Sequence, residues 1–319
     1  MGRYLLRRLG FALLLVFVVS SASLLLTRLA PGDFTEQASD NPAVREALRR
    51  ELGLNRPLAS QYFSWLGGIV RFDFGQSWLY SRPVSTLIAD RALNTAMLAT
   101  VALLLATAIG VPLGIYSGIA RGPGRWLVRA ISVLGISVPP LIGSLLLVFI
   151  AARTGWFPVG GMTSAAGLDL NWSQWLADLA HHLPVPALAL GIPLAASLER
   201  LQSQAIASAS REPFVAASRA RGLEPVQALL RHAWPVSLRP VLGLYGVMIG
   251  SLFSGSFVVE VVTSWPGLGR LMFEALRARD LFLVAGCAAT GALFLAIGTL
   301  IADLLLAWSD PRVRAGDRA

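Results

Sequence analysis

Two acidic side chains within apolar runs are the first candidates for chemistry in this sequence. Glu260 lies near the end of an apolar run from about Pro240 to Val262, and Asp303 lies in a run from about Leu281 to Trp308. A carboxylate inside a membrane-spanning segment is energetically unfavourable and commonly marks an ion, proton or substrate pathway. Both residues are close to the ends of their runs, where the cost of the charge falls. We therefore interpret them as candidates for gating or for lining a pathway.

Three other residue patterns could support chemistry, and the sequence argues against each. The adjacent histidines His181 and His182 point in different directions on any regular element, and we identify no acid or cysteine at a ligand spacing beside them. The serines of the FSGS stretch, Phe253–Ser256, lack a partner histidine in a neighbouring run, and small residues of this kind commonly serve helix packing in membranes. The single cysteine, Cys287, cannot form an intramolecular disulfide. No catalytic, cofactor or metal site is therefore expected on this chain.

The basic residues are of one type, which excludes some classes of protein. All 27 are arginine, and the chain contains no lysine. A nucleotide-binding P-loop needs a lysine that reaches the terminal phosphates, so such a loop is excluded, as is Schiff-base chemistry. The net charge of +9 could suggest a nucleic-acid partner, but the arginines lie mostly in short connectors between apolar runs. That distribution is typical of membrane topology, and no nucleic-acid partner is expected.

The composition indicates which elements position these residues. Of the 319 residues, 55% are hydrophobic and only 14% are charged, whereas a soluble domain usually has about 25% charged residues. Several apolar runs reach the roughly 20 residues that a spanning helix needs. The charged pair Glu199–Arg200 leaves open whether the fourth run ends before or after Glu199. The sequence predicts an all-α membrane protein with six transmembrane helices, at about Leu9–Leu29, Ala92–Ile119, Ala130–Ala151, Pro184–Ala207, Pro240–Val262 and Leu281–Trp308.

The segments between these runs suggest the domain organisation. Residues 30–90 are more polar, and their NPAVREALRRELGL stretch has helical spacing with Gly53 as a stop signal. We therefore expect a helical, extracytoplasmic insert after the first span. The predicted organisation is a first transmembrane segment at residues 1–29, the insert at 30–90, a five-helix core at 91–308 with a cytoplasmic loop at 208–238, and a cytoplasmic tail at 309–319.

The SWPGLG stretch that follows the fifth run predicts a turn, because it combines a rigid proline with two permissive glycines. The residues after it, at about Arg270–Arg279, could form a short re-entrant helix or a plain loop. The sequence does not distinguish these two possibilities.

Arginine placement predicts the orientation of the chain in the membrane. The long first loop is left out of the comparison, since long loops cross regardless of their charge. The short outer connectors would contain only Arg153, Arg270, Arg277 and Arg279. With both termini in the cytoplasm, the cytoplasmic segments would contain Arg121, Arg125, Arg129, Arg211, Arg219, Arg221, Arg231, Arg239, Arg312 and Arg314. An orientation with the N-terminus and the C-terminus inside is therefore expected.

One polar stretch, FVAASRARGLEPVQALLRHAWP at Phe214–Pro235, predicts two short helices that meet at a glycine. Gly222 is well placed as a left-handed helix cap, and Leu223 follows it to contact the helix it caps. Pro225 is suited to the first position of a second helix. Pro235 would stop or kink that helix. The first helix has Phe214, Ala217, Ser218 and Arg221 on one face, and the second has an apolar stripe of Val226, Leu229, Leu230 and Ala233.

This pattern leaves two interpretations open. An amphipathic element could rest on lipid headgroups at the cytoplasmic face. It could equally be a docking surface for a soluble partner.

The same stretch resembles the cytoplasmic EAA loop of ABC importer permeases. In that motif, alanines precede a glycine by a few residues and a proline follows further on; Ala217, Ser218, Gly222 and Pro235 occupy those places. The leading glutamate of the motif would fall at Ala216, so that acid is missing, as it often is in the peptide/nickel branch of the family.

Further stretches resemble that branch in order along the whole chain. They are RYLLRRL at the start, RLAPGD after the first run, LRRELGLNRPLASQYFSWL and DFGQSW in the insert, VEVVTSWPGLGRLMFEALRARD after the fifth run, and LIADLLLAWSDPRVR near the terminus. The chain is similar to the first of the two paired permeases of a dipeptide, oligopeptide or nickel importer. Glu260 and Asp303 fall within matched stretches, which favours a structural or gating role over direct substrate contact.

The resemblance implies a non-catalytic subunit with the type I ABC importer permease fold in the bacterial inner membrane. A sister permease would complete the translocation pathway as a heterodimer. Two cytoplasmic ABC ATPase subunits would bind the ATP and Mg, so this chain would carry no cofactor. An extracytoplasmic binding protein would deliver a peptide. The ATPase-coupling loop would contain Ala216, Ala217, Ser218, Arg219, Gly222 and Pro235.

Alternatives remain at two levels. Within the class, the substrate could be a nickel complex, an opine or glutathione. Outside the class, an ion-coupled secondary transporter could use Glu260 or Asp303, and copurifying ATPase chains would distinguish it from an importer subunit. A membrane enzyme would need a nucleophile with a partner base, which the sequence lacks.

Overall fold

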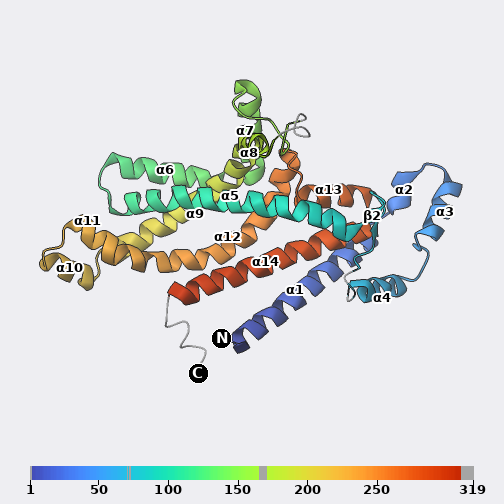
Figure 1. Cartoon of the computed structure of the whole chain (residues 1–319), viewed down its shortest axis with the longest axis horizontal. Coiled ribbons are helices and arrows are strands. Elements are labelled where there is room, and N and C mark those ends of the chain that lie inside the picture. Colours follow the sequence, from blue (N-terminus) through green and yellow to red (C-terminus); the bar gives the residue numbers. More distant parts are fainter. Residues whose placement is uncertain (1, 70, 72, 165–170, 310–319) are drawn as a thin grey trace. The chain divides into compact units, whose positions relative to one another are not determined.

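The computed structural model describes residues 2–69, 71, 73–164 and 171–309, and these residues are mostly helical (Figure 1). The long helices are α1 (Gly2–Leu29), α5 (Val84–Ile119), α9 (Pro184–Ala209), α12 (Trp234–Val262) and α14 (Leu281–Ser309). The shorter ones are α2 (Phe34–Ala38), α3 (Pro42–Glu51), α4 (Leu58–Ile69), α6 (Pro123–Ser137), α7 (Pro140–Thr154), α8 (Trp172–His182), α10 (Pro213–Ala220), α11 (Pro225–Ala228) and α13 (Leu268–Ala278). Strands β1 (Gln76–Ser77) and β2 (Arg82–Pro83) form a small antiparallel hairpin. The predicted tail lies, after Ser309, outside the described residues.

The apolar helices include four to six candidate membrane spans. Four continuous stretches are long and apolar enough, namely Arg8–Leu29, Val84–Ile119, Pro225–Val262 and Leu281–Leu304. Two further spans are possible only as bent pairs, α6 with α7 at 105° and α8 with α9 at 48°. The protein is therefore a helical membrane protein.

The third predicted run, Ala130–Ala151, is divided into two helices rather than forming one. Val138 and Pro139 have extended backbones, with ψ of 112° and 146°, between α6 and α7. A residue before a proline is sterically disfavoured in the helical conformation. The consecutive prolines at 139 and 140 therefore account for the break.

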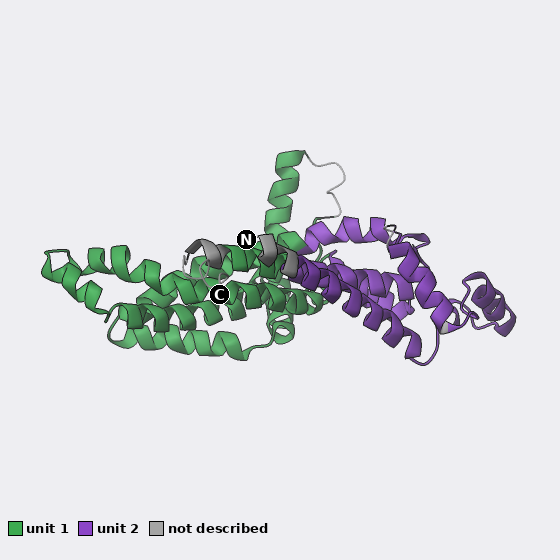
Figure 2. Cartoon of the chain, turned by 90° about the horizontal axis from the view of Figure 1, so that it is seen from below, with its two compact units in different colours: residues 1–4, 96–265, 297–319 green, residues 5–95, 266–296 purple. Residues whose placement is uncertain are grey.

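Contacts divide the chain into two compact units (Figure 2). Unit 1 consists mainly of Ala96–Trp265 together with α14 from Ile297 onward. Unit 2 consists of Leu5–Thr95 and Pro266–Ala296. Both α5 and α14 therefore contribute residues to both units.

In unit 1, α9 packs closely against α5 through a row of glycines. Gly110, Gly114 and Gly118 of α5 all face α9, and a Cβ atom at Gly114 would lie 2.7 Å from the carbonyl oxygen of Glu199. Small residues at this spacing let two helix backbones approach each other in membrane proteins. Helix α9 also packs against α6, α7 and α12, so it is the central helix of this unit.

In unit 2, the β-hairpin is attached to the start of α14 by the buried carboxylate of Asp280. It accepts hydrogen bonds from the Ser77 hydroxyl at 2.6 Å, the Leu79 N–H at 3.0 Å and the Leu283 N–H at 3.2 Å. Helix α13 precedes Asp280, so residues 268–278 form a helix, and the alternative of a plain loop at Arg270–Arg279 is wrong.

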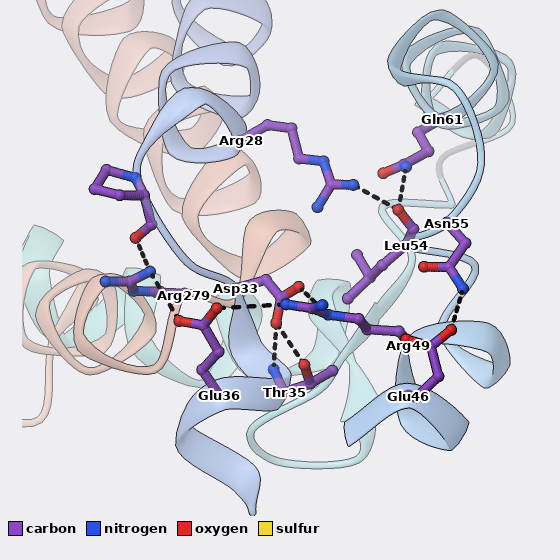
Figure 3. Close-up of polar contacts among 11 residues, drawn as sticks. Arg28, Asp33, Thr35, Glu36, Glu46, Arg49, Leu54, Asn55, Gln61 and Arg279 are labelled. Atoms are coloured by element: carbon purple, nitrogen blue, oxygen red, sulfur yellow. Dashed lines mark hydrogen bonds and ion pairs between the residues drawn. The ribbon is translucent and has the colours of Figure 1, made fainter. Parts of the chain in front are cut away.

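The insert of unit 2 begins with a polar network around Asp33 (Figure 3). The carboxylate of Asp33 caps α2 by accepting from the Thr35 N–H at 3.0 Å, and it accepts from Arg49 Nε at 2.8 Å. Burial alone would raise the pKa of Asp33, but the hydrogen bonds from Thr35 and Arg49 outweigh it, so that the pKa is lowered from 3.8. Arg49 also contacts Glu36 at 3.4 Å. Helix α3 ends as predicted, with Gly53 in the left-handed region at φ +66°.

Candidate functional site

The candidate site is the helix–glycine–helix element, residues 213–228, whose first helix ends in a complete glycine cap. Gly222 has a φ of +93°, and its N–H donates to the Arg219 carbonyl at 2.9 Å. The Leu223 N–H donates to the Ser218 carbonyl at 3.3 Å. These two bonds around a left-handed glycine form a Schellman motif. The predicted cap at Gly222 is therefore confirmed.

The second helix begins as predicted but does not end at Pro235. Glu224 is its extended N-cap residue and Pro225 is its first residue. A π-helical turn, η2 (Leu229–Ala233), connects α11 to α12, and Pro235 lies in the first turn of α12. Pro225–Val262 is therefore one helical stretch of 38 residues. Of the two predicted effects of Pro235, the stop is wrong, because the wider turn before it changes the hydrogen-bond register where the proline lacks an N–H, and the kink stays a prediction.

One face of this region packs against the C-terminal end of α9, which we expect on the cytoplasmic side. Val215 is fully buried, and Ser218 is buried beside it, with its hydroxyl donating to the Val215 carbonyl at 2.7 Å. The predicted apolar stripe is divided, because Val226 is 63% exposed and Leu230 is 46% exposed. The residues that pack together here are Val215, Ala228, Leu229 and Ala233 with Ile206 and Ala209 of α9.

The opposite face is exposed and combines apolar with basic side chains. Its exposed residues are Phe214, Ala216, Ala217, Arg219, Arg221, Val226, Leu230 and Arg231. A surface of this composition can bind a protein groove or a membrane surface, and it contains no nucleophile and no base.

The two predicted gating acids lie in unit 1 on different helices. Glu260 is fully buried near the end of α12, and its carbonyl accepts from the Trp265 N–H at 2.9 Å. Asp303 is half-buried in α14. These positions do not test a gating role, so both residues remain candidates.

Sequence reasoning missed a buried polar cluster on α9. Glu199 and Gln202 are almost completely buried. The Ser117 hydroxyl of α5 donates to Glu199 Oε1, and Gln202 Nε2 donates to the Ser237 hydroxyl at 2.9 Å. Helix α9 continues to Ala209, so the fourth run passes Glu199 rather than ending there. The signal in the sequence was the spacing of polar residues at 199, 202 and 203, which share one helical face.

The histidine pair has an acidic neighbour that the spacing argument overlooked. Asp178 lies four residues before His182, with Oδ1 at 3.5 Å from His182 Nδ1. His181 Nε2 is 2.9 Å from the Trp156 carbonyl oxygen, and His182 Nδ1 is 2.8 Å from the Asp178 carbonyl oxygen. Among the described residues, no three histidine, cysteine or acidic side chains are grouped as a metal site.

Comparison with known proteins places this architecture in a family. Residues 110–315 match the family described as "Binding-protein-dependent transport system inner membrane component", and residues 1–99 match the family of its N-terminal region. The oligopeptide transport system permease protein AppB of Bacillus subtilis is 33% identical over 98% of this chain and 99% of its own length. The dipeptide transport system permease protein DppB of Lactococcus lactis is 32% identical over 98% of this chain and 100% of its own length.

The chain therefore belongs to the family of inner membrane components of binding-protein-dependent transport systems. The resemblance to ABC importer permeases that the motifs indicated is confirmed. Among solved structures, an inward-facing MetNI methionine ABC transporter chain matches 72% of this chain with 18% identity and a TM-score of 0.46. That similarity is too low to support an inference.

Proposed function

We propose that this chain is the six-span permease subunit of an ATP-driven importer of peptides, in which it forms half of the translocation pathway. The observation that carries the proposal is the match over 98% of the chain to relatives named as oligopeptide and dipeptide permeases. A sister permease forms the other half, and an extracytoplasmic binding protein delivers the peptide. Nickel complexes, opines and glutathione remain alternatives only for the substrate.

The helix–glycine–helix element is the contact for the ATPases in this proposal. Its inner face is anchored on α9 through Val215 and Ala228, while Phe214 and Val226 are exposed, as is Leu230 in the π-helical turn that follows. Apolar side chains on a rigid, anchored element are suited to insertion into a groove of a partner protein. The ATP and Mg bind to the two partner subunits, and this chain has no catalytic residue.

The proposed orientation has both termini in the cytoplasm and the insert of residues 30–90 outside. The arginines in the connectors support it. Single cysteines at Ser210 and Ser60, each in a Cys287→Ala background, test it with a membrane-impermeant thiol reagent. In cells whose outer barrier is permeabilised while the inner membrane stays intact, the Ser60→Cys variant should react with the reagent and the Ser210→Cys variant should not. The reverse pattern would overturn the orientation.

A transport experiment tests the function. The chain is coexpressed with its sister permease, ATPases and binding protein, and the assembly is reconstituted into vesicles. Uptake of a labelled dipeptide should require ATP and every subunit, and unlabelled nickel complexes should not compete. ATP-dependent uptake of a nickel complex without peptide uptake would replace the proposed substrate. Ion-driven uptake by this chain alone would overturn the proposal.

A further inference from the structure

Helix α4 of the insert packs against a part of α1 that lies inside a candidate membrane span. The hydroxyls of Tyr62 in α4 and Ser21 in α1 are hydrogen-bonded at 3.0 Å. Trp65 of α4 is 5% exposed and packs in one buried cluster with Leu24 of α1 and Ala285 of α14. Both partner helices are long and apolar enough to cross a membrane. The insert is therefore attached to the spans themselves, not only to the loops that connect them.

The position of these contacts along α1 gives a depth for α4. The candidate span of α1 ends at Leu29. Leu24 is five positions before that end, which corresponds to roughly 7.5 Å at 1.5 Å per residue. Half of the hydrocarbon core of a bilayer is roughly 15 Å thick. The packed face of α4 therefore lies near the boundary between headgroups and acyl chains, where helices that lie in the plane of a membrane are found.

The composition of α4 suits this boundary. Residues 57–70 contain no charged side chain, and Arg56 and Arg71 flank them. Arginines at the ends of an apolar membrane segment commonly extend to the headgroups. Helix α3 of the same insert is different, because five of its ten residues are charged and none is buried. The insert thus combines one helix suited to water with one suited to a membrane surface.

The exposed part of α4 has an apolar flank and a polar flank. Ala59, Phe63 and Gly67 follow one another at intervals of four residues, so they share one flank of the helix. All three are exposed, and Phe63 is 67% exposed. Ser60 and Ser64 are exposed on the neighbouring flank. A helix that lies in a membrane surface needs this division, with one side in acyl chains and the other toward water.

We propose that α4 lies in the plane of the membrane at its outer surface, with the flank of Ala59, Phe63 and Gly67 among the acyl chains of lipids. The flank of Ser60 and Ser64 faces the headgroups and water. The partner is lipid because α4 is attached to α1, which exposes apolar side chains along its span. In this position α4 anchors the insert to the membrane and leaves α3 in water. Only the assignment to the outer leaflet rests on the proposed orientation.

A soluble binding protein is a less suitable partner for this flank. A protein that arrives from solution meets surfaces that stand in water, and α3 offers a charged surface of that kind. Helix α4 offers no charge, and its contacts with Ser21 and Leu24 hold it against the span. Lipid therefore meets the flank first, before any soluble partner can reach it.

Spin labels on α4 test the proposal in the assembled importer, reconstituted in lipid nanodiscs without the binding protein. Each label is attached to a single cysteine in a Cys287→Ala background, with cysteine-free partner subunits. The variants are Ala59→Cys, Ser60→Cys, Phe63→Cys, Ser64→Cys and Gly67→Cys. Power saturation compares collisions with oxygen, which concentrates in hydrocarbon, and with a neutral gadolinium chelate, which stays in water. The ratio of oxygen to chelate accessibility should be several-fold higher on the apolar flank than on the polar flank.

Val44 of α3 supplies a matched control for exposure alone. It is an apolar residue that is 49% exposed in the same insert, and a label at Val44→Cys should have the low ratio of a site in water. A second measurement uses charge, since Phe63→Asp places a carboxylate among acyl chains and should speed proteolysis of the insert several-fold. Val44→Asp should leave the rate of proteolysis unchanged. Size-exclusion chromatography checks that each variant assembles, and the labelled positions serve if Phe63→Asp fails to assemble.

The alternatives give different results at Phe63→Cys. Chelate accessibility as high as at Val44→Cys would overturn the membrane position, and a fall of that accessibility on addition of the binding protein would assign the flank to that protein. Low accessibility to both reagents would mean that another subunit covers the flank, which also overturns the proposal. High oxygen and low chelate accessibility would support it. None of these measurements depends on transport, so the membrane position of α4 stands or fails separately from the proposed peptide cargo.

Discussion

The hydroxyl of Ser77 donates a 2.6 Å hydrogen bond to the carboxylate of Asp280, which is 203 positions later in the chain. Asp280 also accepts from two backbone N–H groups, so one buried carboxylate attaches the β-hairpin and caps the first turn of α14. Asp280 therefore connects two segments of unit 2 that are far apart in the sequence.

Asp280→Ala should destabilise unit 2 strongly, because it leaves three donors without an acceptor, and two of them are buried. We expect a loss of about 3–5 kcal/mol, against about 1–3 kcal/mol for Ser77→Ala, which removes only one of those donors. Thermal unfolding of the purified protein in detergent would show the difference as a larger fall in the apparent midpoint for Asp280→Ala. Equal midpoints for the two variants would contradict this account of the hairpin.

Lowering the pH should destabilise the insert, because Asp33 becomes protonated. Its pKa is lowered below 3.8 in the folded protein, so its hydrogen bonds stabilise the fold above the unfolded pKa and are lost as the pH falls through the folded value. Hydrogen exchange measured from neutral pH to well below the ordinary pKa of 3.8 should show protection of α2 and α3 decreasing at the acid end, after correction for intrinsic rates. In Asp33→Asn, protection should be low throughout and nearly independent of pH. A wild-type profile without the acid decrease would rule out this role.

Helix packing in unit 1 should depend on Gly114. A Cβ atom there would lie 2.6 Å from the Gln202 Cβ and 2.7 Å from the Glu199 carbonyl oxygen. Gly114→Ala should therefore destabilise the protein by about 1–3 kcal/mol. The matched control is Gly243→Ala in α12, where a Cβ atom meets nothing within 4 Å, and the helix should gain up to about 1 kcal/mol. Similar melting points for both variants would exclude close packing of α5 on α9.

Gly222→Val should weaken association with the ATPases without preventing membrane insertion. A Cβ atom at Gly222 meets nothing within 4 Å, so the substitution adds only the strain of a positive φ, about 1–2 kcal/mol. Gly53→Val places the same strain in the equivalent cap of α3, at φ +66°, and should leave association unchanged. Copurification of ATPases with each variant measures the effect. Loss in both variants would indicate general misfolding, and loss in neither would mean that the element does not contact the ATPases.

Two valines on opposite faces of the same element should respond differently to a charge. Val226 is 63% exposed, so Val226→Asp should leave the fold intact and disrupt ATPase binding. Val215 is fully buried, so Val215→Asp should detach the element from α9, because an unpaired buried charge is strongly unfavourable. Protease sensitivity of the 208–238 region reports detachment, and ATPase copurification reports binding. A protease-resistant Val226→Asp variant with normal copurification would show that this face does not form the interface.

Local signals in the sequence predicted local structure well. The cap at Gly222 and the restart at Pro225 follow from φ preferences that act within a few residues. The same reasoning could not divide the stripe of Val226 and Leu229 between an exposed and a buried face. Helical periodicity shows which residues share a face, but the packing of α9 decides which of them are covered.

The misreadings have different physical causes, and one of them is a partner far away in the sequence. Glu199 resembled the charged end of a span because its hydrogen-bond donor, Ser117, comes from another helix 82 positions earlier. The continuation of the helix through Pro235 depends on a π-helical turn, for which propensities give no signal. The break between α6 and α7 was visible in the consecutive prolines and could have been predicted.

The helix that begins at Pro225 continues through the π-helical turn to Val262. Its 38 residues correspond to roughly 57 Å at 1.5 Å per residue, and there is no flexible loop between α11 and α12 to absorb a movement. Gly222, where the chain turns between α10 and α11, lies just before this continuous helix begins. We expect a displacement of α11 to be transmitted along this continuous helix to its far end, where Glu260 is buried.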